Sequence, residues 1–336
     1  LVDWKTRKGF IVVEGYTNNP LVGNTTNSIH AFIKDMYDNA TFSDPAPTYL
    51  LIVGDDGQVP SFSGNSGSHL SDMYYCEFDG GGDFYPEMYY GRLSATNAGE
   101  VEVQVNKTLT HEMYTFSDPS FLDDVVLVAG VDVSMAPTYG NGQINYGTEY
   151  YFNSDHGIYS NTYLYPASGS AASQIRSDIS QGAGYVNYTA HGYEQGWADP
   201  SFTNSDVNNL TNNGKYPLMV GNCCLTNAFD TGECFGEALL RKNNGGAIGY
   251  IGGSDVTYWN EDFWWGVGSG NINANPSYNN TGHGAYDGMF HFQNEPNWAV
   301  VNSAIMLVGN LAVAEANGMD DYYWEIYHLM GDPSIS

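Results

Sequence analysis

The residues whose types and spacing most clearly indicate catalysis are a histidine and a cysteine, His191 and Cys224, separated by 33 positions. A free thiol has a pKa of about 8.5 and is mostly protonated at neutral pH, so it needs a base to become a nucleophile. An imidazole within reach can take the thiol proton and later deliver a proton to a leaving amine. The pair therefore indicates covalent catalysis by a cysteine with a histidine as its base.

Both residues directly follow apolar segments that have the composition of β-strands. His191 comes after residues 183–189, and Cys224 comes after residues 216–222. Parallel strands end at the same edge of an open α/β sheet, which is where such sheets bind their ligands. We therefore expect the thiol and the imidazole to lie together at one edge, where Gly192 permits a close approach of the backbone.

The rest of the chain alternates between strand and helix in the same way. Apolar runs predict strands, at residues 9–13, 49–53, 88–92, 125–129, 183–189, 216–222 and 247–251. Apolar residues at helical spacing predict helices between them, among others at residues 29–36, 98–114 and 235–242. The order predicts an α/β fold. A chain of 336 residues exceeds the usual single core, so we expect two subdomains, residues 1–117 and 118–336, each with a mostly parallel sheet flanked by helices.

The charge balance limits the partners of the protein. The chain has 38 acidic residues against 10 lysines and arginines, which makes nucleic acid and anionic membranes poor partners. It contains no apolar stretch of about 18 residues, so we expect no membrane-spanning segment. Its charged start, residues 1–8, lacks the apolar region of a signal peptide. We interpret the sequence as a mature fragment, without signal and pro-segments, of a secreted or cell-surface protein.

Other kinds of catalytic site find little support in the sequence. The four cysteines have neither the number of a disulfide framework nor the spacing of a zinc site. A serine-hydrolase elbow, a phosphate-binding loop and a dinucleotide fingerprint are also missing. A carbohydrate-binding protein or glycoside hydrolase stays open, because tyrosine, tryptophan, asparagine and acidic residues are abundant. An inactive adhesion module is disfavoured by the intact cysteine and histidine.

Several motifs give the sequence a family resemblance that covers nearly the whole chain. They are NYTAHG at 187–192, WADP at 197–200, GNCC at 221–224, CFGE at 234–237, YWNED at 258–262 and MGDP at 330–333. With these motifs the chain resembles the gingipain family of cysteine peptidases, and most of all its lysine-specific branch. The resemblance implies a caspase-like α/β/α sandwich and a cysteine endopeptidase that acts on proteins or peptides.

The resemblance also assigns roles to residues of the catalytic site. It implies that Cys224 is the nucleophile, forming a thioester acyl-enzyme, and that His191 acts first as base and then as acid. Asp132, after the strand predicted at 125–129, would orient the imidazole. The backbone N–H groups of Gly192 and Cys224 would form the oxyanion hole, in which each donor contributes about 3 kcal/mol.

Substrate choice follows from the same resemblance. Asp262 would lie at the bottom of the specificity pocket, Trp259 along the aliphatic stem of the bound side chain, and Thr189 near its charged head. This implies cleavage after a basic residue, with lysine ahead of arginine. Residues 136–148 contain no acidic residue, which weakens an arginine-specific reading. An arginine-specific or broader basic specificity remains the alternative, because pocket depth decides between the two cations.

The resemblance finally implies a structural calcium ion. The corresponding ligands are oxygen donors, as Ca²⁺ prefers, and they are Asp55, Asp79, Asp83, Glu87 and the backbone carbonyl of Tyr85. The run of glycines at 80–82 makes the loop longer than the family pattern, which weakens the assignment of Asp79. We expect no organic cofactor.

Overall fold

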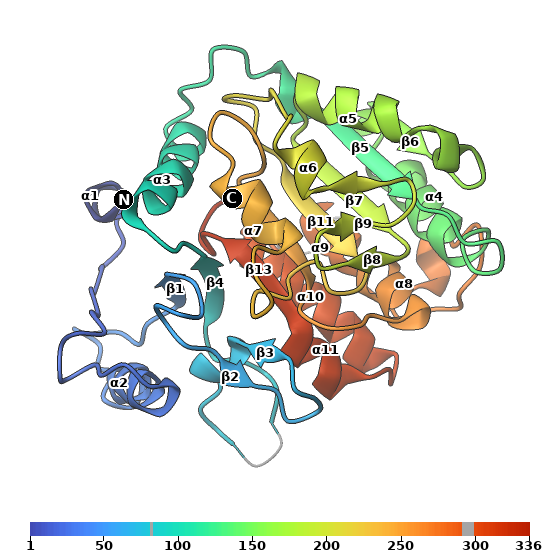
Figure 1. Ribbon diagram of the computed structural model, residues 1–336. Coiled ribbons are helices and arrows are strands. Elements are labelled where there is room, and N and C mark those ends of the chain that lie inside the picture. Colours follow the sequence, from blue (N-terminus) through green and yellow to red (C-terminus); the bar gives the residue numbers. More distant parts are fainter. Residues whose placement is uncertain (81–82, 291–298) are drawn as a thin grey trace.

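The computed structural model describes residues 1–80, 83–290 and 299–336, and a single eight-stranded sheet runs through its centre (Figure 1). In spatial order its strands are β1 (Tyr49–Val53), β4 (Tyr89–Leu93), β13 (Tyr327–Gly331), β12 (Gly249–Gly253), β11 (Leu218–Asn222), β7 (Tyr185–Thr189), β5 (Asp124–Ala129) and β6 (Tyr159–Tyr163).

The strands of this sheet form two parallel blocks that run in opposite directions. In one block β12, β11, β7, β5 and β6 are parallel to their neighbours. β13 is antiparallel to β12, while β4 and β1 run parallel to β13. The carboxyl ends of β5, β7 and β11 therefore share one edge of the sheet, and the carboxyl ends of β1 and β4 lie at the opposite edge.

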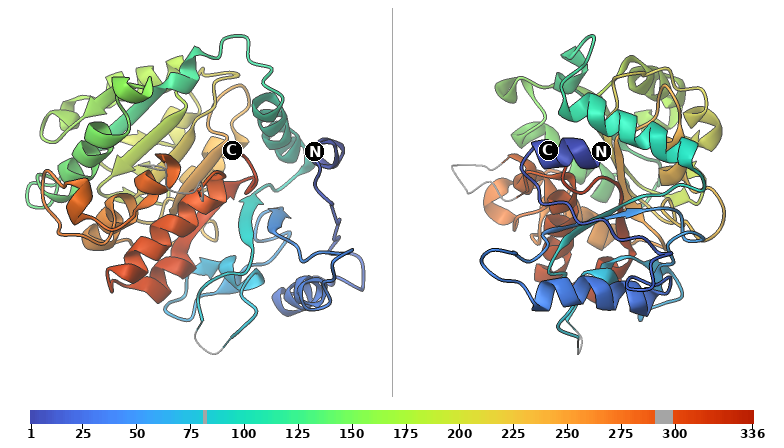
Figure 2. Two further views of the ribbon diagram at one scale, coloured as in Figure 1. Left: turned by 180° about the vertical axis from the view of Figure 1, so that it is seen from behind. Right: turned by 90° about the vertical axis from the view of Figure 1, so that its left-hand side faces the viewer.

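The central strands are buried on both faces, and their side chains alternate between two cores. In β5, Leu127 and Ala129 belong to one core, whereas Val126 and Val128 belong to the other. The first core is covered by α4 (Tyr139–Tyr150), α8 (Trp259–Val267), α9 (Ala285–Phe290), α10 (Asn302–Glu315) and α11 (Asp320–Ile326). The second is covered by α5 (Ala172–Gln181), α6 (Asn204–Val207) and α7 (Phe235–Arg241), with α3 (Ala98–Glu112) packed on α7. Figure 2 shows α10 crossing one face of the sheet.

Smaller elements surround this sandwich. Two short helices, α1 (Val2–Arg7) and α2 (Thr26–Asp38), precede the first strand. Two small sheets are formed by β2 (Phe62–Ser63) with β3 (Leu70–Ser71), and by β8 (Gly192–Tyr193), β9 (Gly196–Trp197) and β10 (Phe202–Thr203). Single 3-10 turns occupy Met73–Tyr75, Ser120–Asp123, Ser154–His156, Ala167–Ser170 and Tyr278–Asn280.

The α/β sandwich predicted from the sequence is confirmed, with two differences in detail. Residues 9–13 form no strand, because Ile11 and Val13 face solvent and lack the burial that a sheet strand needs. Instead of two separate sheets there is one, because β13 joins β4 through the pair Met330 and Arg92. The subdomain boundary at residue 117 stays a prediction. Within the described ranges, no helix combines the length and apolar character needed to cross a membrane.

Candidate active site

A histidine and an aspartate from neighbouring strand ends meet at one edge of the sheet. Asp132 follows β5 and His191 follows β7, and a hydrogen bond of 2.8 Å joins His191 Nε2 to Asp132 Oδ2. The other oxygen, Oδ1, accepts from the backbone N–H groups of Ser134 and Met135 at 2.8 and 2.9 Å. Burial raises the pKa of Asp132, but the hydrogen bonds from His191 and these amides outweigh it and lower the pKa overall. Asp132 is thus held as an anion that fixes the imidazole ring through Nε2.

The thiol of Cys224 lies just after β11, the strand that neighbours β7 in the sheet. Its sulfur accepts a hydrogen bond from the backbone N–H of Thr257 at 3.4 Å and donates to the carbonyl oxygen of Thr257 at 3.6 Å. No hydrogen bond joins Cys224 to His191 in the described part of the chain. Burial raises the pKa of the Cys224 thiol, the Thr257 amide lowers it, and the charge of Asp262 raises it further. The resting sulfur is therefore protonated and turned toward Thr257.

The adjacent cysteine has a different environment. Cys223 is fully buried, and its sulfur lies 3.7 Å from the hydroxyl of Thr226. Burial raises the pKa of the Cys223 thiol well above its ordinary value. Cys223 therefore packs as a core side chain, while Cys224 is partly exposed.

Gly192 packs directly against the two cysteines. A Cβ atom at this position would lie 2.7 Å from the carbonyl oxygen of Cys224 and 2.8 Å from the sulfur of Cys223. These distances leave no room for a side chain. The backbones of residues 192 and 224 are therefore in close contact, and their role as an oxyanion hole stays a prediction.

Asp262, in the first turn of α8, is a buried carboxylate surrounded by hydroxyl groups. The residue is 4% exposed. Its Oδ2 accepts from the Thr257 hydroxyl at 2.7 Å, and its Oδ1 accepts from the hydroxyls of Tyr323 and Tyr327 at 3.0 and 2.9 Å. Burial raises the pKa of Asp262 to about 7, against the effect of these three donors. Among the described residues no lysine, arginine or histidine pairs with Asp262, and its role in a specificity pocket stays a prediction.

The hydroxyl of Tyr327 links this carboxylate to the strand that carries the thiol. It accepts a hydrogen bond from the side-chain amide of Asn222, the last residue of β11, at 3.0 Å. The amide oxygen of Asn222 in turn accepts from Gln143 at 2.9 Å. A buried polar network therefore runs from Asp262 to the residue two positions before Cys224.

The two other residues expected at the pocket lie nearby, and their roles stay predictions. The ring of Trp259 stands edge-on to the imidazole of His191, with 5.6 Å between ring centroids. Thr189, the last residue of β7, is 1% exposed and pairs with Asn222 in the sheet. Trp259 thus contacts the imidazole, and Thr189 lies beside the end of β11.

The expected calcium ligands are not all brought together. Asp55 follows β1 at the opposite edge of the sheet, where its carboxylate forms a 3.0 Å ion pair with Arg241. Glu87 instead accepts from the backbone N–H of Phe78 at 2.7 Å, and Asp83 accepts from the N–H of Tyr85 at 2.9 Å. Over the residues that the structure describes, no group of three or more histidine, cysteine, aspartate or glutamate side chains is arranged to hold a metal ion.

Carboxylates do crowd the loop that contains Glu87. Burial raises the pKa of Glu87, and the nearby charges of Asp79 and Glu77 raise it further. Gly81 and Gly82 lie outside the described residues. The loop residues fit the charge of a cation, but Asp55 does not fit as their partner.

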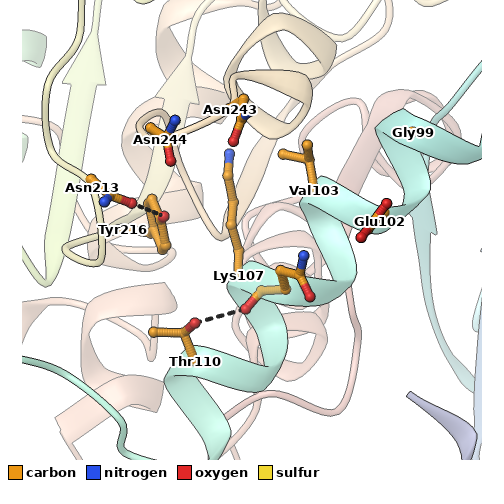
Figure 3. Close-up of a pocket in the computed structure, with 10 residues that line it drawn as sticks. Gly99, Glu102, Val103, Lys107, Thr110, Asn213, Tyr216, Asn243 and Asn244 are labelled. Atoms are coloured by element: carbon orange, nitrogen blue, oxygen red, sulfur yellow. Dashed lines mark hydrogen bonds between the residues drawn. The ribbon is translucent and has the colours of Figure 1, made fainter.

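A separate hollow lies between α3 and the loops at residues 213–216 and 243–244 (Figure 3). Its volume is about 490 Å³, and none of the residues predicted for the catalytic or pocket site lines it. The ammonium group of Lys107 bonds the backbone carbonyls of Leu239 and Leu240 at 2.9 and 2.8 Å, at the end of α7. Lys107 therefore stabilises the packing of α3 against the end of α7.

Sequence reasoning missed three residues of the site. Thr257 directly precedes the YWNED motif, and Tyr323 and Tyr327 lie four positions apart in an aromatic run. Hydroxyl side chains at that spacing were the available signal, because residues four apart at a helix end can point at one target. Their target could not be known before α8 and α11 were placed together.

Comparison with known proteins shows one family over the whole chain. The profile of peptidase family C25 matches residues 1–336. Lys-gingipain of Porphyromonas gingivalis is 40% identical over 341 residues, which cover 99% of this chain and 19% of the relative. Gingipain R2 of the same organism is 26% identical over 253 residues, covering 73% of this chain and 33% of the relative. The chain thus spans about a fifth of the length of the Lys-gingipains that it matches.

Solved structures agree in fold. One described as a protease superimposes with a TM-score of 0.91 at 38% identity, covering 99% of this chain and 74% of the other. The Arg-specific cysteine proteinase gingipain R superimposes with a TM-score of 0.70 at 23% identity, covering 93% of this chain and 68% of the other. The second likeness, at this low identity, supports the fold alone.

Proposed function

Because this chain belongs to peptidase family C25, a family of cysteine endopeptidases, we propose that it hydrolyses peptide bonds on the carboxyl side of lysine. Cys224 is the proposed nucleophile, His191 the proposed base and acid, and Asp132 the residue that orients the imidazole. The 2.8 Å bond between His191 and Asp132, with a partly exposed thiol after the neighbouring strand β11, supports these roles.

The proposed reaction has two halves. In the first, the Cys224 thiol transfers its proton to His191 Nδ1 while the sulfur attacks the substrate carbonyl carbon. The N–H groups of Gly192 and Cys224 stabilise the resulting oxyanion. When the tetrahedral species collapses, the C–N bond breaks, and His191 gives its proton to the departing amine. The carbonyl carbon remains bound to sulfur as a thioester.

In the second half, water hydrolyses the thioester. His191 takes a proton from the water molecule as its oxygen attacks the thioester carbon. The C–S bond then breaks, and the sulfur leaves as a thiolate that recovers its proton from His191. The carboxylic acid product dissociates, and both catalytic residues return to their starting states.

One observation carries the preference for lysine. Asp262 is buried, is positioned by three hydroxyl donors, and is joined through Thr257 to the sulfur of Cys224. A buried carboxylate without a partner is costly, so a cation that enters the pocket gains what an uncharged side chain cannot. Donors already surround both carboxylate oxygens, which leaves less room for the planar fork of arginine than for a compact ammonium group.

The test is the ratio of kcat/KM for matched peptides that differ only in lysine or arginine before the cleaved bond. We expect lysine to be strongly preferred by the wild type and the preference to collapse in Asp262→Asn. Asp287→Asn is the matched control, because Asp287 is another buried carboxylate that accepts from tyrosine hydroxyls, those of Tyr146 and Tyr151, which do not bond Asp262. Equal rates on both peptides, or an Asp262→Asn variant with unaltered preference, would overturn the pocket assignment.

We also propose a calcium ion in the loop around Glu87, and action outside the cell. The crowding of Glu87 with Asp79 and Glu77 supports the first proposal, because a divalent cation would relieve their repulsion. The engagement of Asp55 with Arg241 removes that residue from the proposed ligands. The acidic composition, 38 acidic against 10 basic residues, is in keeping with the second.

A further inference from the structure

The contacts of Thr257 point to a connection between the pocket and the nucleophile. Its backbone N–H and carbonyl both bond the sulfur of Cys224, and its hydroxyl donates to Oδ2 of Asp262 at 2.7 Å. One residue thus contacts the proposed attacking atom and the proposed recognition charge. We propose that Thr257 is a positioning residue that keeps the Cys224 thiol at rest until a cation occupies the pocket of Asp262.

Thr257 is well suited to transmit a change, because it has little freedom of its own. It is 8% exposed. Its methyl group lies 2.9 Å from the place where a Cβ on Gly253 would be, so only a glycine in β12 leaves space for it. Because the Thr257 hydroxyl donates to Oδ2, a shift of the Asp262 carboxylate toward a bound cation draws on this hydroxyl. Its backbone then moves relative to the sulfur.

Charge acts in the same direction as this geometry. The negative charge of Asp262 disfavours a thiolate at Cys224, whereas the N–H of Thr257 favours it. The other titratable groups near the sulfur are His191 with Asp132 at the neighbouring strand ends, Cys223, and the phenols of Tyr188 and Tyr322. An ammonium group beside Asp262 cancels the one buried negative charge in this set that has no cationic partner among the described residues.

The resulting step is a proton transfer, with no change of oxidation state. With the pocket empty, the S–H of Cys224 donates to the carbonyl of Thr257. With a cation in the pocket, that bond is given up and the proton passes from sulfur to His191 Nδ1. The substrate would thereby switch on the nucleophile that attacks it, which limits reaction with molecules that lack the charge.

This inference rests on the proposed function, since it needs a cation in the pocket of Asp262, but its test does not use peptide cleavage. The probe is iodoacetamide, and the readout is the rate of Cys224 alkylation by intact mass at pH 7. The rate is measured alone, with saturating n-butylammonium as a mimic of the lysine side chain, and with n-butanol as its uncharged counterpart. Cys224→Ala identifies any label taken up by the three buried cysteines.

We expect n-butylammonium to speed alkylation about threefold or more, since the rate of a thiol below its pKa gains roughly that much for each unit by which the pKa falls. n-Butanol should have no effect. Asp262→Asn should alkylate faster than the wild type without any cation and should not respond to one. Slower or unchanged alkylation with n-butylammonium, or a slower Asp262→Asn variant, would overturn the inference.

The role of Thr257 itself is tested by a pair of variants. Thr257→Val loses the hydroxyl but keeps the shape, and we expect the increase in its alkylation rate with n-butylammonium to fall by at least half. Thr257→Ser keeps the hydroxyl and should show the same increase as the wild type. Thr148→Val is the control, because the hydroxyl of Thr148 donates to carbonyls of its own helix, α4. A Thr257→Val variant that responds like the wild type would refute the positioning role.

The two proposals can fail separately. Lysine preference in cleavage without any effect of n-butylammonium on alkylation would leave the proposed function standing and remove this inference. A clear effect on alkylation without lysine preference would do the reverse.

Discussion

Replacing Asp262 by asparagine should make the folded protein more stable while it damages catalysis. Burial raises the pKa of Asp262 from its ordinary value of 3.8 to about 7. Each pKa unit corresponds to about 1.4 kcal/mol, so the ionised carboxylate costs the folded state about 4 kcal/mol relative to the neutral form. Asparagine keeps the shape and avoids this cost. Its oxygen can accept from Tyr323 and Tyr327, and its NH₂ group can donate to Thr257.

The sign of the pH dependence follows from the raised pKa. Neutral Asp262 contributes fully to stability below pH 3.8, and this contribution is lost as the pH rises toward 7, because the unfolded chain ionises first. The advantage of the asparagine variant should therefore grow with pH. We expect it to reach about 4 kcal/mol at pH 8 and to be about 2 kcal/mol smaller at pH 5.5.

Urea unfolding at the two pH values measures this difference, in a Cys224→Ala background that prevents self-digestion. Asp132→Asn serves as a control of opposite sign, because the pKa of Asp132 is lowered and its ionised form stabilises the fold at high pH. An Asp262→Asn variant that is less stable than its parent at pH 8 would refute the reasoning. So would an advantage of equal size at both pH values.

Two further predictions concern the nucleophile and the metal. Cys224→Ala and His191→Ala should each abolish peptide cleavage, while Cys223→Ala retains much of it. Gly192→Ala should also lose cleavage, because its Cβ would lie 2.7 Å from the carbonyl oxygen of Cys224. Activity and circular dichroism of the four variants check this, and an active Cys224→Ala variant would reverse the assignment. Chelation with EDTA should lower the unfolding temperature, and added calcium should restore it. At a hundredfold excess over its dissociation constant, calcium should raise the free energy of unfolding by about 2.7 kcal/mol. A Glu87→Gln variant should lose this response, and an unfolding midpoint insensitive to EDTA would remove the calcium proposal.

The sequence predicted that Asp132, His191 and Cys224 follow strands ending at one edge of the sheet, because that part of the fold depends on local pattern. Apolar runs at 125–129, 183–189 and 216–222 are buried on both faces, as parallel central strands require, so their ends had to share an edge. The bond between His191 and Asp132 follows from that arrangement.

The features that the sequence did not predict depend on contacts between segments far apart in the chain. Asp55 was expected beside Glu87, but β1 and β4 are parallel, so Asp55 after β1 and Glu87 before β4 lie at opposite edges of the sheet, and no periodicity reveals the direction of a strand. Two of the three donors to Asp262 come from α11 and β13, more than 60 residues further along the chain. Residues 9–13 looked like a strand because their composition is apolar, although their side chains face solvent.

The position of β13 in the sheet determines when the sheet can be completed during synthesis of the chain. This strand is the last of the sheet to be synthesised, yet it lies in the middle, between β4 and β12. Until residues 327–331 leave the ribosome, those two strands keep open edges, and pairing across such a long sequence separation is slow. Tyr327, which bonds both Asp262 and Asn222, arrives with the same strand. A nascent chain therefore carries Cys224 and His191 about 100 residues before the strand whose Tyr327 completes the hydrogen bonds of Asp262.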